Sequence, residues 1–211
     1  MAFGRAVETC LGVAVDLRGL ASDGKTDQAI MREIVEAQGF DRAVDWPALT
    51  ATFLAYVAEA VREEPGEACP GVRPLLEALA RRDDVTLALG TGNFERGARA
   101  KLAAHGLDRY FATGGFGDDA IARDTILRAG IRRAEALRGR AFDRVVVIGD
   151  TPHDARAAAQ VGAWSLCVAT GPFPVDALAA AGATLVRRAL APAGEVIDAL
   201  DALPACPTAG S

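Results

Sequence analysis

Residues 144–163, RVVVIGDTPHDARAAAQVGA, contain four branched apolar residues followed at once by a polar turn and a helix-like segment. The turn begins with Gly149 and Asp150, and a second carboxylate, Asp154, follows four positions after the first. A continuous apolar run without alternation is typical of a strand buried on both faces of a parallel sheet. Ligands of open α/β sheets bind at the carboxyl ends of the strands, so both acids are candidate functional residues.

Strand-like and helix-like segments alternate on both sides of this stretch. The other strand-like runs lie at 85–93, 110–117, 164–171 and 184–188. The segments between them repeat apolar residues at helical spacing. Such alternation predicts the α/β class, with a parallel sheet covered by helices on both faces. We assign this core to residues 69–203 and expect the tail, 204–211, to be disordered.

The first third of the chain has no comparable alternation. Apolar residues recur at helical spacing in three segments, which cover 2–12, 25–39 and 46–64. Gly12 and Gly39 are suited to ending the first two helices. We therefore predict a separate helical layer or cap at residues 1–68.

The composition is that of a globular chain without a basic surface. It has 211 residues, 51% of them hydrophobic, and a formal net charge of −5 with a pI near 5.1. This charge argues against nucleic acid as a partner, and no apolar run is long enough to span a bilayer. The four cysteines show neither paired nor metal-ligand spacing. We therefore expect a cytoplasmic protein without nucleic-acid or membrane partners.

A second strand end carries residues suited to an anion. The run that starts at Val85 ends in Gly90, Thr91, Gly92 and Asn93, where glycines on either side of a hydroxyl expose backbone N–H groups. A hydroxyl with bare amides suits a phosphate, and the carboxylates after the later strand suit Mg²⁺. The two strand ends together predict a metal-assisted phosphoryl site.

Structural roles are the alternatives for these residues. Asp150 and Asp154 are also suited to capping the helix that follows them. Thr91 and Asn93 are also typical of turns. Their occurrence at two strand ends of one predicted sheet, in this order, favours the functional interpretation.

Five segments resemble successive motifs of the haloacid dehalogenase superfamily, in particular its phosphoglycolate-phosphatase-like branch. They are ASDGKTDQAIMREIV (21–35), PGVRPLLEAL (70–79), LALGTGNFERGARAKLAAHGL (87–107), FGDDAIARDTIL (116–127) and VVVIGDTPHDARAAAQVGA (145–163). The resemblance covers nearly the whole chain. It implies a Rossmann-like core with a helical cap inserted after the first strand. It also implies Mg²⁺ and hydrolysis of the phosphomonoester of a small phosphorylated metabolite through an aspartyl-phosphate.

The resemblance further implies how the phosphate is bound. Thr91 would bind the transferring phosphoryl group together with the amides of Gly92 and Asn93. Arg123 would neutralise phosphate charge, and Arg128, one turn further into its helix, is the weaker candidate for this role.

The remaining implied roles concern the metal and the cap. Asp150 would ligate Mg²⁺, and Asp154 would ligate it or orient its waters. Lys25 and Thr26 would face the substrate from the cap. An ordinary surface lysine and a helix N-cap threonine are the alternatives for these two residues.

The nucleophile motif of the family is missing from the sequence. In the family, an apolar first strand ends in Asp-x-Asp-Gly-Thr, whose first Asp attacks phosphorus and whose second is the general acid and base. No Asp-x-Asp occurs in the 211 residues. The segment LGVAVDLRGL (11–20) is similar, but Arg18 and Leu20 stand where the second Asp and the Thr are required. We therefore expect Asp16 to lie in a loop between cap helices.

The missing motif also affects the expected sheet. By the resemblance, Met1 lies inside the cap, and the absent first strand is the central one, between residues 85–89 and 145–148. A core without this strand would stay open to another strand, which favours association, including homo-oligomers.

Two hypotheses of function follow. In the first, the full-length protein is a Mg²⁺-dependent phosphomonoester phosphatase, and this chain is inactive or nearly so. In the second, the chain is a non-catalytic protein that binds a phosphorylated ligand or another subunit. Haloacid dehalogenation is a further alternative, but it needs no metal, so the carboxylates at 150 and 154 count against it.

Overall fold

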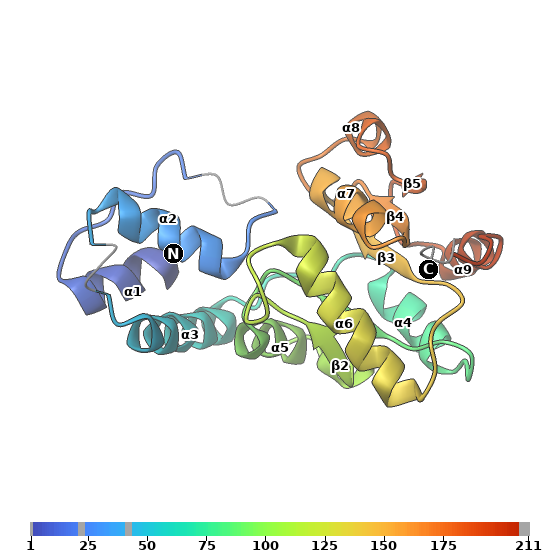
Figure 1. The fold of residues 1–211 in the computed structure, drawn as a ribbon, viewed down its shortest axis with the longest axis horizontal. Coiled ribbons are helices and arrows are strands. Elements are labelled where there is room, and N and C mark those ends of the chain that lie inside the picture. Colours follow the sequence, from blue (N-terminus) through green and yellow to red (C-terminus); the bar gives the residue numbers. More distant parts are fainter. Residues whose placement is uncertain (1, 21–23, 41–43, 207–211) are drawn as a thin grey trace.

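The computed structural model describes residues 2–20, 24–40 and 44–206, and three helices precede an alternation of strands and helices (Figure 1). The helices are α1 (Ala2–Leu11), α2 (Asp27–Ala37), α3 (Trp46–Glu63), α4 (Val72–Ala80), α5 (Glu95–Ala103), α6 (Arg123–Arg138), α7 (Pro152–Gln160), α8 (Val175–Ala180) and α9 (Ala193–Asp201). The strands are β1 (Ala88–Gly90), β2 (Thr113–Gly115), β3 (Val146–Gly149), β4 (Trp164–Val168) and β5 (Leu185–Arg187), and a 3-10 helix covers Asp108–Tyr110. The predicted α/β class is confirmed.

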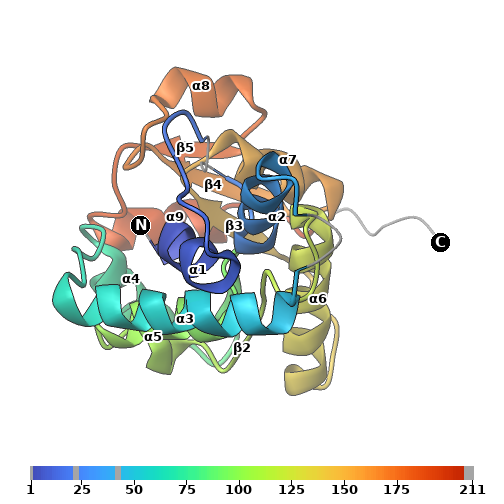
Figure 2. The same ribbon diagram turned by 90° about the vertical axis from the view of Figure 1, so that its left-hand side faces the viewer.

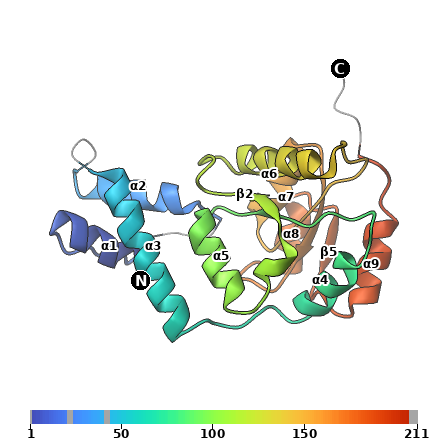
Figure 3. The same ribbon diagram turned by 90° about the horizontal axis from the view of Figure 1, so that it is seen from below.

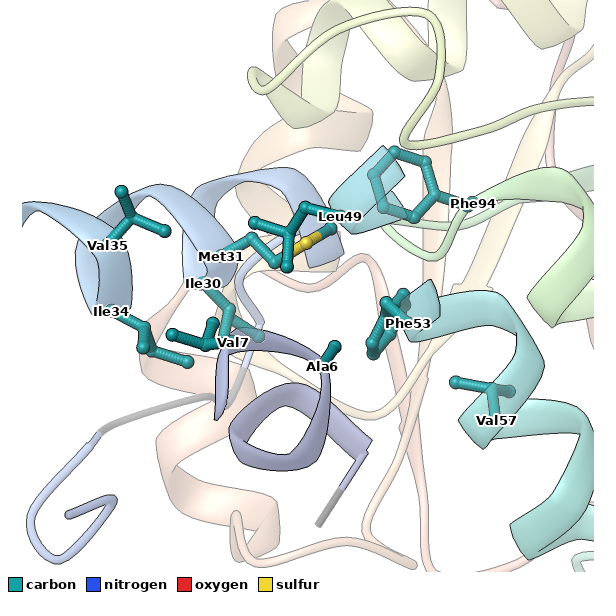
Figure 4. Close-up of a cluster of buried hydrophobic side chains, with 10 residues drawn as sticks. All are labelled: Ala6, Val7, Ile30, Met31, Ile34, Val35, Leu49, Phe53, Val57 and Phe94. Atoms are coloured by element: carbon teal, nitrogen blue, oxygen red, sulfur yellow. The ribbon is translucent and has the colours of Figure 1, made fainter. Parts of the chain in front are cut away.

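The first three helices form a bundle of their own, which we call the cap. α1 packs along α3 and also contacts α2. Buried side chains of the three helices form one apolar cluster (Figure 4), which consists of Ala6, Val7, Ile30, Met31, Ile34, Val35, Leu49, Phe53 and Val57. Phe94, just before α5, joins this cluster and meets Phe53 edge-on, with ring centroids 6.1 Å apart. The cap is therefore tied to the core by an aromatic contact.

Side-chain caps begin two of these helices. Thr26 accepts a hydrogen bond from the Ala29 N–H at the start of α2, at 3.1 Å. Asp45 accepts one from the Ala48 N–H at the start of α3, at 3.0 Å. Each bond satisfies an N–H group that the first turn of a helix leaves without an intrahelical partner.

Residues 12–20, which follow α1, form neither helix nor strand. Asp16 lies in this segment with 59% of its side chain exposed, paired with Arg18 at 2.6 Å. The expectation that Asp16 lies in a loop of the cap is confirmed.

The α/β part holds two parallel sheets rather than one. β1 pairs with β2, with Gly90 opposite Gly115. The second sheet has the order β3–β4–β5. Among the described residues β1 and β3 are not paired with each other, so the sheet is interrupted between them. This interruption agrees with the predicted absence of a central strand.

Helices cover both faces of the β3–β4–β5 sheet. Along β4 the side chains alternate, so that Leu166 and Val168 pack in a cluster with α4 and α9. Cys167 points to the other face and packs with α7 and α8. Figure 2 shows the cap in front of this sheet. The prediction of a parallel sheet covered on both faces is confirmed.

α6 lies directly against β2 (Figure 3). A Cβ on Gly115 would lie 1.9 Å from the Ile126 carbonyl oxygen, and a Cβ on Gly130 would lie 2.8 Å from the Gly115 nitrogen. Both distances are far below van der Waals contact, so only glycines permit this approach. The close packing fixes the start of α6, where Arg123 lies, relative to the sheet.

The residues after α9 run back along the core. The Trp164 indole N–H donates to the Pro204 carbonyl at 2.9 Å, and the Cys206 N–H donates to the Asp143 carbonyl at 2.8 Å. Residues 204–206 are therefore held against the core, in contrast to the disorder expected from 204 onward. The rest of that tail, 207–211, lies outside the described residues. No helix in the described ranges is long and apolar enough to cross a membrane.

Candidate active site

The loop after β1 is held in place by its own backbone and side chains. The Thr91 hydroxyl accepts a hydrogen bond from the Asn93 N–H at 3.1 Å, and the Thr91 N–H donates to the Gly115 carbonyl of β2 at 3.1 Å. Thr91 and Asn93 are partly buried, and Gly92 is buried. Thr91 therefore stabilises a turn, which was the alternative interpretation of this residue from the sequence. The turn fixes the Thr91 hydroxyl at the end of β1.

The side chain of Asn93 connects this loop to the cap. Its Nδ2 donates to Asp27 Oδ1 at 2.9 Å, and its Oδ1 accepts from Lys101 Nζ on α5 at 3.1 Å. Both ends of the Asn93 amide are thus used in positioning the loop.

The turn after β3 is organised around Asp154. Its Oδ2 accepts hydrogen bonds from the N–H groups of Asp150 and Thr151, at 3.2 and 3.0 Å, and from the Thr151 hydroxyl at 2.9 Å. Thr151 and Asp154 form a capping box at the start of α7. Gly149 makes room for this carboxylate, because a Cβ there would lie 2.3 Å from Asp154 Cγ. The capping alternative is therefore confirmed for Asp154.

Asp154 also joins α6 to this turn. Its Oδ1 accepts from Arg123 Nε at 2.9 Å and lies 2.7 Å from Arg123 Nη2. The side chain of Asp154 is 6% exposed and that of Arg123 is 22% exposed, so water is largely excluded from the pair. Arg128 instead donates to the Gln160 carbonyl at the far end of α7. Of the two candidate arginines, Arg123 is the one at the carboxyl end of β3.

Asp150 is the acid nearest the end of β3 in the chain. Its side chain is partly buried and lies beside Gly171, where a Cβ would be 2.5 Å from Asp150 Oδ2. Proteins commonly hold Mg²⁺ by one or two carboxylates while the ion keeps several waters. Asp150, with Asp154 behind it, fits such an ion as a partial set of ligands.

The described residues hold no group of three or more His, Cys, Asp or Glu side chains placed to bind a metal. Within these residues there is no complete protein cage, and further ligands would be waters or phosphate oxygens. Because both oxygens of Asp154 are engaged with Arg123 and with the turn, its geometry favours orienting those waters over direct ligation.

The residues just before and at the start of α2 touch both strand ends. The Asp27 N–H donates to the Gly92 carbonyl at 2.8 Å, and a Cβ on Gly92 would lie 2.9 Å from Thr26 Cα. On the other side, a Cβ on Gly24 would lie 2.4 Å from His153 Cδ2, so the His153 ring lies against the cap backbone. The loops after β1 and β3 therefore both contact the residues around the start of α2, beneath the cap.

Lys25 and Thr26, the cap residues singled out in the sequence, have local partners. Lys25 pairs with Glu33 on α2 and keeps 36% of its side chain exposed. Thr26 is buried and caps α2, so its N-cap alternative is confirmed. That either residue faces a substrate stays a prediction.

Asp27 is a residue of this region that the sequence analysis did not single out. It is 4% exposed and accepts hydrogen bonds from Asn93 Nδ2 and from the Phe94 N–H, both at 2.9 Å. Burial raises the pKa of the Asp27 carboxyl above its usual value, although those two bonds and the charge of Lys101 act in the opposite direction. In the sequence, an acid directly after an N-cap threonine indicates only a favourable helix start.

The raised pKa of Asp27 predicts a pH dependence of stability. A carboxyl whose pKa is higher in the folded state adds stability at low pH, and this contribution is lost as the pH rises from 3.8 through the folded pKa. The unfolding free energy of the unaltered chain should therefore fall relative to that of Asp27→Asn across this window. Above the window, the unfolding free energies of the two proteins should change with pH in the same way. Urea unfolding at a series of pH values measures the difference. Asp45→Asn, at the other capped helix start, is the control. An unfolding free energy of the unaltered chain that rises with pH relative to that of Asp27→Asn would contradict the raised pKa of Asp27.

Several solved structures have a fold similar to that of this chain. Three similar solved structures are a predicted phosphatase from Clostridium acetobutylicum (19% identity, 94% of this chain and 91% of that chain, TM-score 0.67), a hydrolase from Pseudomonas syringae (20%, 94% and 90%, 0.68) and a predicted phosphoglycolate phosphatase from Haemophilus somnus (17%, 93% and 88%, 0.67). At these identities the likeness shows the fold alone. No curated protein matches the chain.

The family itself is shown by a sequence match. The family model of the haloacid dehalogenase-like hydrolases matches residues 12–162, a span that includes both strand ends and the cap residues above them. The chain therefore belongs to the haloacid dehalogenase-like hydrolases.

Proposed function

We propose that this chain carries the metal- and phosphate-binding part of a phosphatase that acts on the phosphomonoester of a small metabolite. The main support is that the loops at the two strand ends, residues 91–93 after β1 and residues 150–154 after β3, both contact the short cap segment around the start of α2. A hydroxyl, backbone amides and an arginine suit the oxygens of a phosphate, and a carboxylate suits Mg²⁺. Phosphoglycolate is the first substrate to test, because the sequence resembles that branch of the family.

Each residue has a distinct role in this proposal. Thr91 and the amide of Gly92 hold the phosphoryl oxygens, and Arg123, oriented by Asp154, neutralises their charge. Asp150 ligates Mg²⁺, which when bound polarises the phosphoryl group and offsets its negative charge.

We propose further that the 211-residue chain alone does not turn over a phosphomonoester. It contains no Asp-x-Asp, and Asp16 is an exposed cap residue paired with Arg18. A non-catalytic protein that binds a phosphorylated ligand is the second candidate function, and the same missing motif supports it.

We also propose a cytoplasmic location for the protein. The four cysteines are free thiols, which supports this location.

Inorganic phosphate should bind the chain at least about tenfold more tightly with Mg²⁺ than without it, a difference of about 1.4 kcal/mol. The ion would offset the repulsion between phosphate and the Asp150 carboxylate. Asp150→Asn should abolish this gain without weakening phosphate binding in the absence of Mg²⁺, since the substitution removes a like charge. Isothermal titration calorimetry of both proteins, with and without Mg²⁺, measures these affinities.

The two candidate arginines provide a matched control in the same titration. Arg123→Ala should weaken phosphate binding by about tenfold, and Arg128→Ala, on the same helix, should leave it unchanged. Equal losses would contradict the assignment of Arg123, and a missing Mg²⁺ effect in the unaltered chain would contradict the metal site. Mg²⁺-dependent phosphate release by the unaltered chain would overturn its proposed inactivity and make Asp16 the next residue to test.

A further inference from the structure

One carboxylate lies buried at the contact between the cap and the core. It belongs to Asp27, the first residue of α2, which is 4% exposed. Its Oδ1 accepts a hydrogen bond from Asn93 Nδ2, and its Oδ2 accepts one from the Phe94 N–H, both at 2.9 Å. The Asp27 N–H in turn donates to the Gly92 carbonyl at 2.8 Å. This single cap residue therefore holds residues 92, 93 and 94 of the loop after β1.

Docking of the cap does not by itself require a carboxylate at this place. An apolar contact already joins the two parts, because Phe94 meets Phe53 of α3 within the apolar cluster of the cap (Figure 4). Burying a charge costs free energy even where hydrogen bonds offset part of it. An apolar side chain at position 27 would avoid this cost, whereas a carboxylate adds hydrogen bonds of defined direction.

The hydrogen bonds of Asp27 determine which way the Asn93 amide points. An ionised carboxylate only accepts hydrogen bonds, and a lysine ammonium only donates them. Asn93 lies between two such groups, with Nδ2 on Asp27 and with Oδ1 3.1 Å from Lys101 Nζ of α5. Turning the amide over would set its NH2 group against the ammonium and its oxygen against the carboxylate. The side chains of Asp27, Asn93 and Lys101, which we call the polar network, therefore permit one orientation of this amide.

The loop held in this way has two donors left for a ligand. The Asn93 N–H donates to the Thr91 hydroxyl oxygen at 3.1 Å, which leaves the hydroxyl hydrogen for another acceptor. The Gly92 carbonyl is bonded to the Asp27 N–H, and the Gly92 N–H has no acceptor in the part of the chain that the structure describes. A hydroxyl and a backbone amide on adjacent residues suit the oxygens of a phosphate.

We propose that Asp27 is a positioning residue of the phosphate site. It makes no contact with the phosphate itself, but it holds residues 91–94 in the shape in which the Thr91 hydroxyl and the Gly92 N–H are directed at the ligand. This inference rests on the proposed function, because it concerns the same phosphate. The affinity for phosphate should therefore depend on a residue of the cap that lies behind the loop.

Asp27→Asn tests the polar network in the full 211-residue chain. The new amide has one oxygen, so either Asn93 Nδ2 or the Phe94 N–H would face a donor instead of an acceptor. Inorganic phosphate, titrated with Mg²⁺ present by isothermal titration calorimetry, should bind at least about tenfold more weakly than to the unaltered chain. Without phosphate, the Thr91 and Asn93 amides should exchange their hydrogens at least about tenfold faster by NMR, because the loop opens more often.

An exchange of the two side chains distinguishes positioning from a general loss of stability. In Asp27→Asn/Asn93→Asp, the amide at position 27 can donate to the carboxylate at position 93 and accept from the Phe94 N–H. The other oxygen of that carboxylate can accept from Lys101, so every bond of the network is restored with the same net charge. Phosphate affinity and amide exchange should return to within about threefold of the values of the unaltered chain.

Phe53→Leu is the matched control at the same contact between cap and core. It weakens the apolar contact with Phe94 and leaves the polar network intact. Its unfolding free energy in urea should be lower than that of the unaltered chain. Its phosphate affinity should stay within about threefold of that of the unaltered chain.

Three results would overturn the positioning role and leave the proposed function in place. They are unchanged phosphate affinity in Asp27→Asn, no recovery of affinity in a folded double variant, and an equal loss of affinity in Phe53→Leu. If the unaltered chain binds no phosphate, the proposed function is contradicted, and amide exchange alone decides the role of Asp27. Faster exchange of Thr91 and Asn93 in Asp27→Asn, reversed in the double variant, would then support the positioning of the loop, and unchanged exchange would overturn it.

Discussion

A chain extended at its amino terminus by an apolar strand that ends in Asp-x-Asp-Gly-Thr is expected to release phosphate from phosphoglycolate at least about a thousandfold faster than the 211-residue chain. The added strand would lie between β1 and β3, where the sheet is interrupted, and would bring a carboxylate nucleophile to the edge where Thr91 and Asp150 lie. A covalent nucleophile divides hydrolysis into two easier steps, and the absence of such a group costs orders of magnitude in rate. Phosphate release with Mg²⁺, and again with EDTA, measures the gain.

Variants of the extended chain isolate the cause of this gain. Asn in place of the first Asp of the added strand should reduce phosphate release to the level of the 211-residue chain. Asp150→Asn should reduce it to the same level, because this substitution removes the carboxylate that would hold Mg²⁺. Arg128→Ala should keep the gain. If the extended chain folds cooperatively, binds phosphate with Mg²⁺ and still releases none, the non-catalytic candidate function replaces the phosphatase.

Asp154→Ala is expected to lower the unfolding free energy by about 3 kcal/mol, because it leaves Arg123 without its partner in a largely dry environment. It also removes the acceptor for the Asp150 and Thr151 N–H groups and opens the capping box of α7. For a chain of this size the loss corresponds to a fall in Tm of roughly 6–12 °C. Urea and thermal unfolding followed by circular dichroism measure both quantities.

Two further variants test whether this loss has the stated cause. Asp154→Asn keeps an acceptor for the turn and loses the charge, so its destabilisation should lie between that of Asp154→Ala and the unaltered chain. Asp16→Ala removes a comparable ion pair at an exposed position, with Arg18, and should leave Tm unchanged. Equal effects of Asp154→Ala and Asp16→Ala would contradict a structural role for the Arg123 pair.

The sequence was sufficient where the determining signal is local. Continuous apolar runs such as the one before Asp150 indicate buried parallel strands, and both β3 and β4 are parallel strands. β4 is largely buried, but the prediction of burial is wrong for β3, where Ile148 is 41% exposed beside the interruption of the sheet. Thr26 followed by an apolar helical repeat indicates an N-cap, and the structure confirms it. The predicted ends of β1 were less accurate, because only residues 88–90 lie opposite β2 and the described part of the chain provides no partner for the other edge of the strand.

Long-range contacts within the site could not be derived in the same way. The bond between Asn93 and Asp27 joins residues 66 positions apart, and that between Arg123 and Asp154 joins residues 31 apart. No periodicity encodes such pairs, because they depend on how the cap and α6 pack against the strand ends. For this reason Asp27 was missed, and the choice between Arg123 and Arg128 required the structure.

We propose that the loops after β1 and β3 form one site for a metal and a phosphate. Crystals of the 211-residue chain grown with Mn²⁺ in place of Mg²⁺ and tungstate in place of phosphate test it most directly, because both give anomalous signals. We predict manganese bound to the Asp150 carboxylate and tungstate against Thr91 and Arg123, at the same edge beneath the cap. Tungstate bound away from Thr91, or manganese bound without Asp150, would contradict the account.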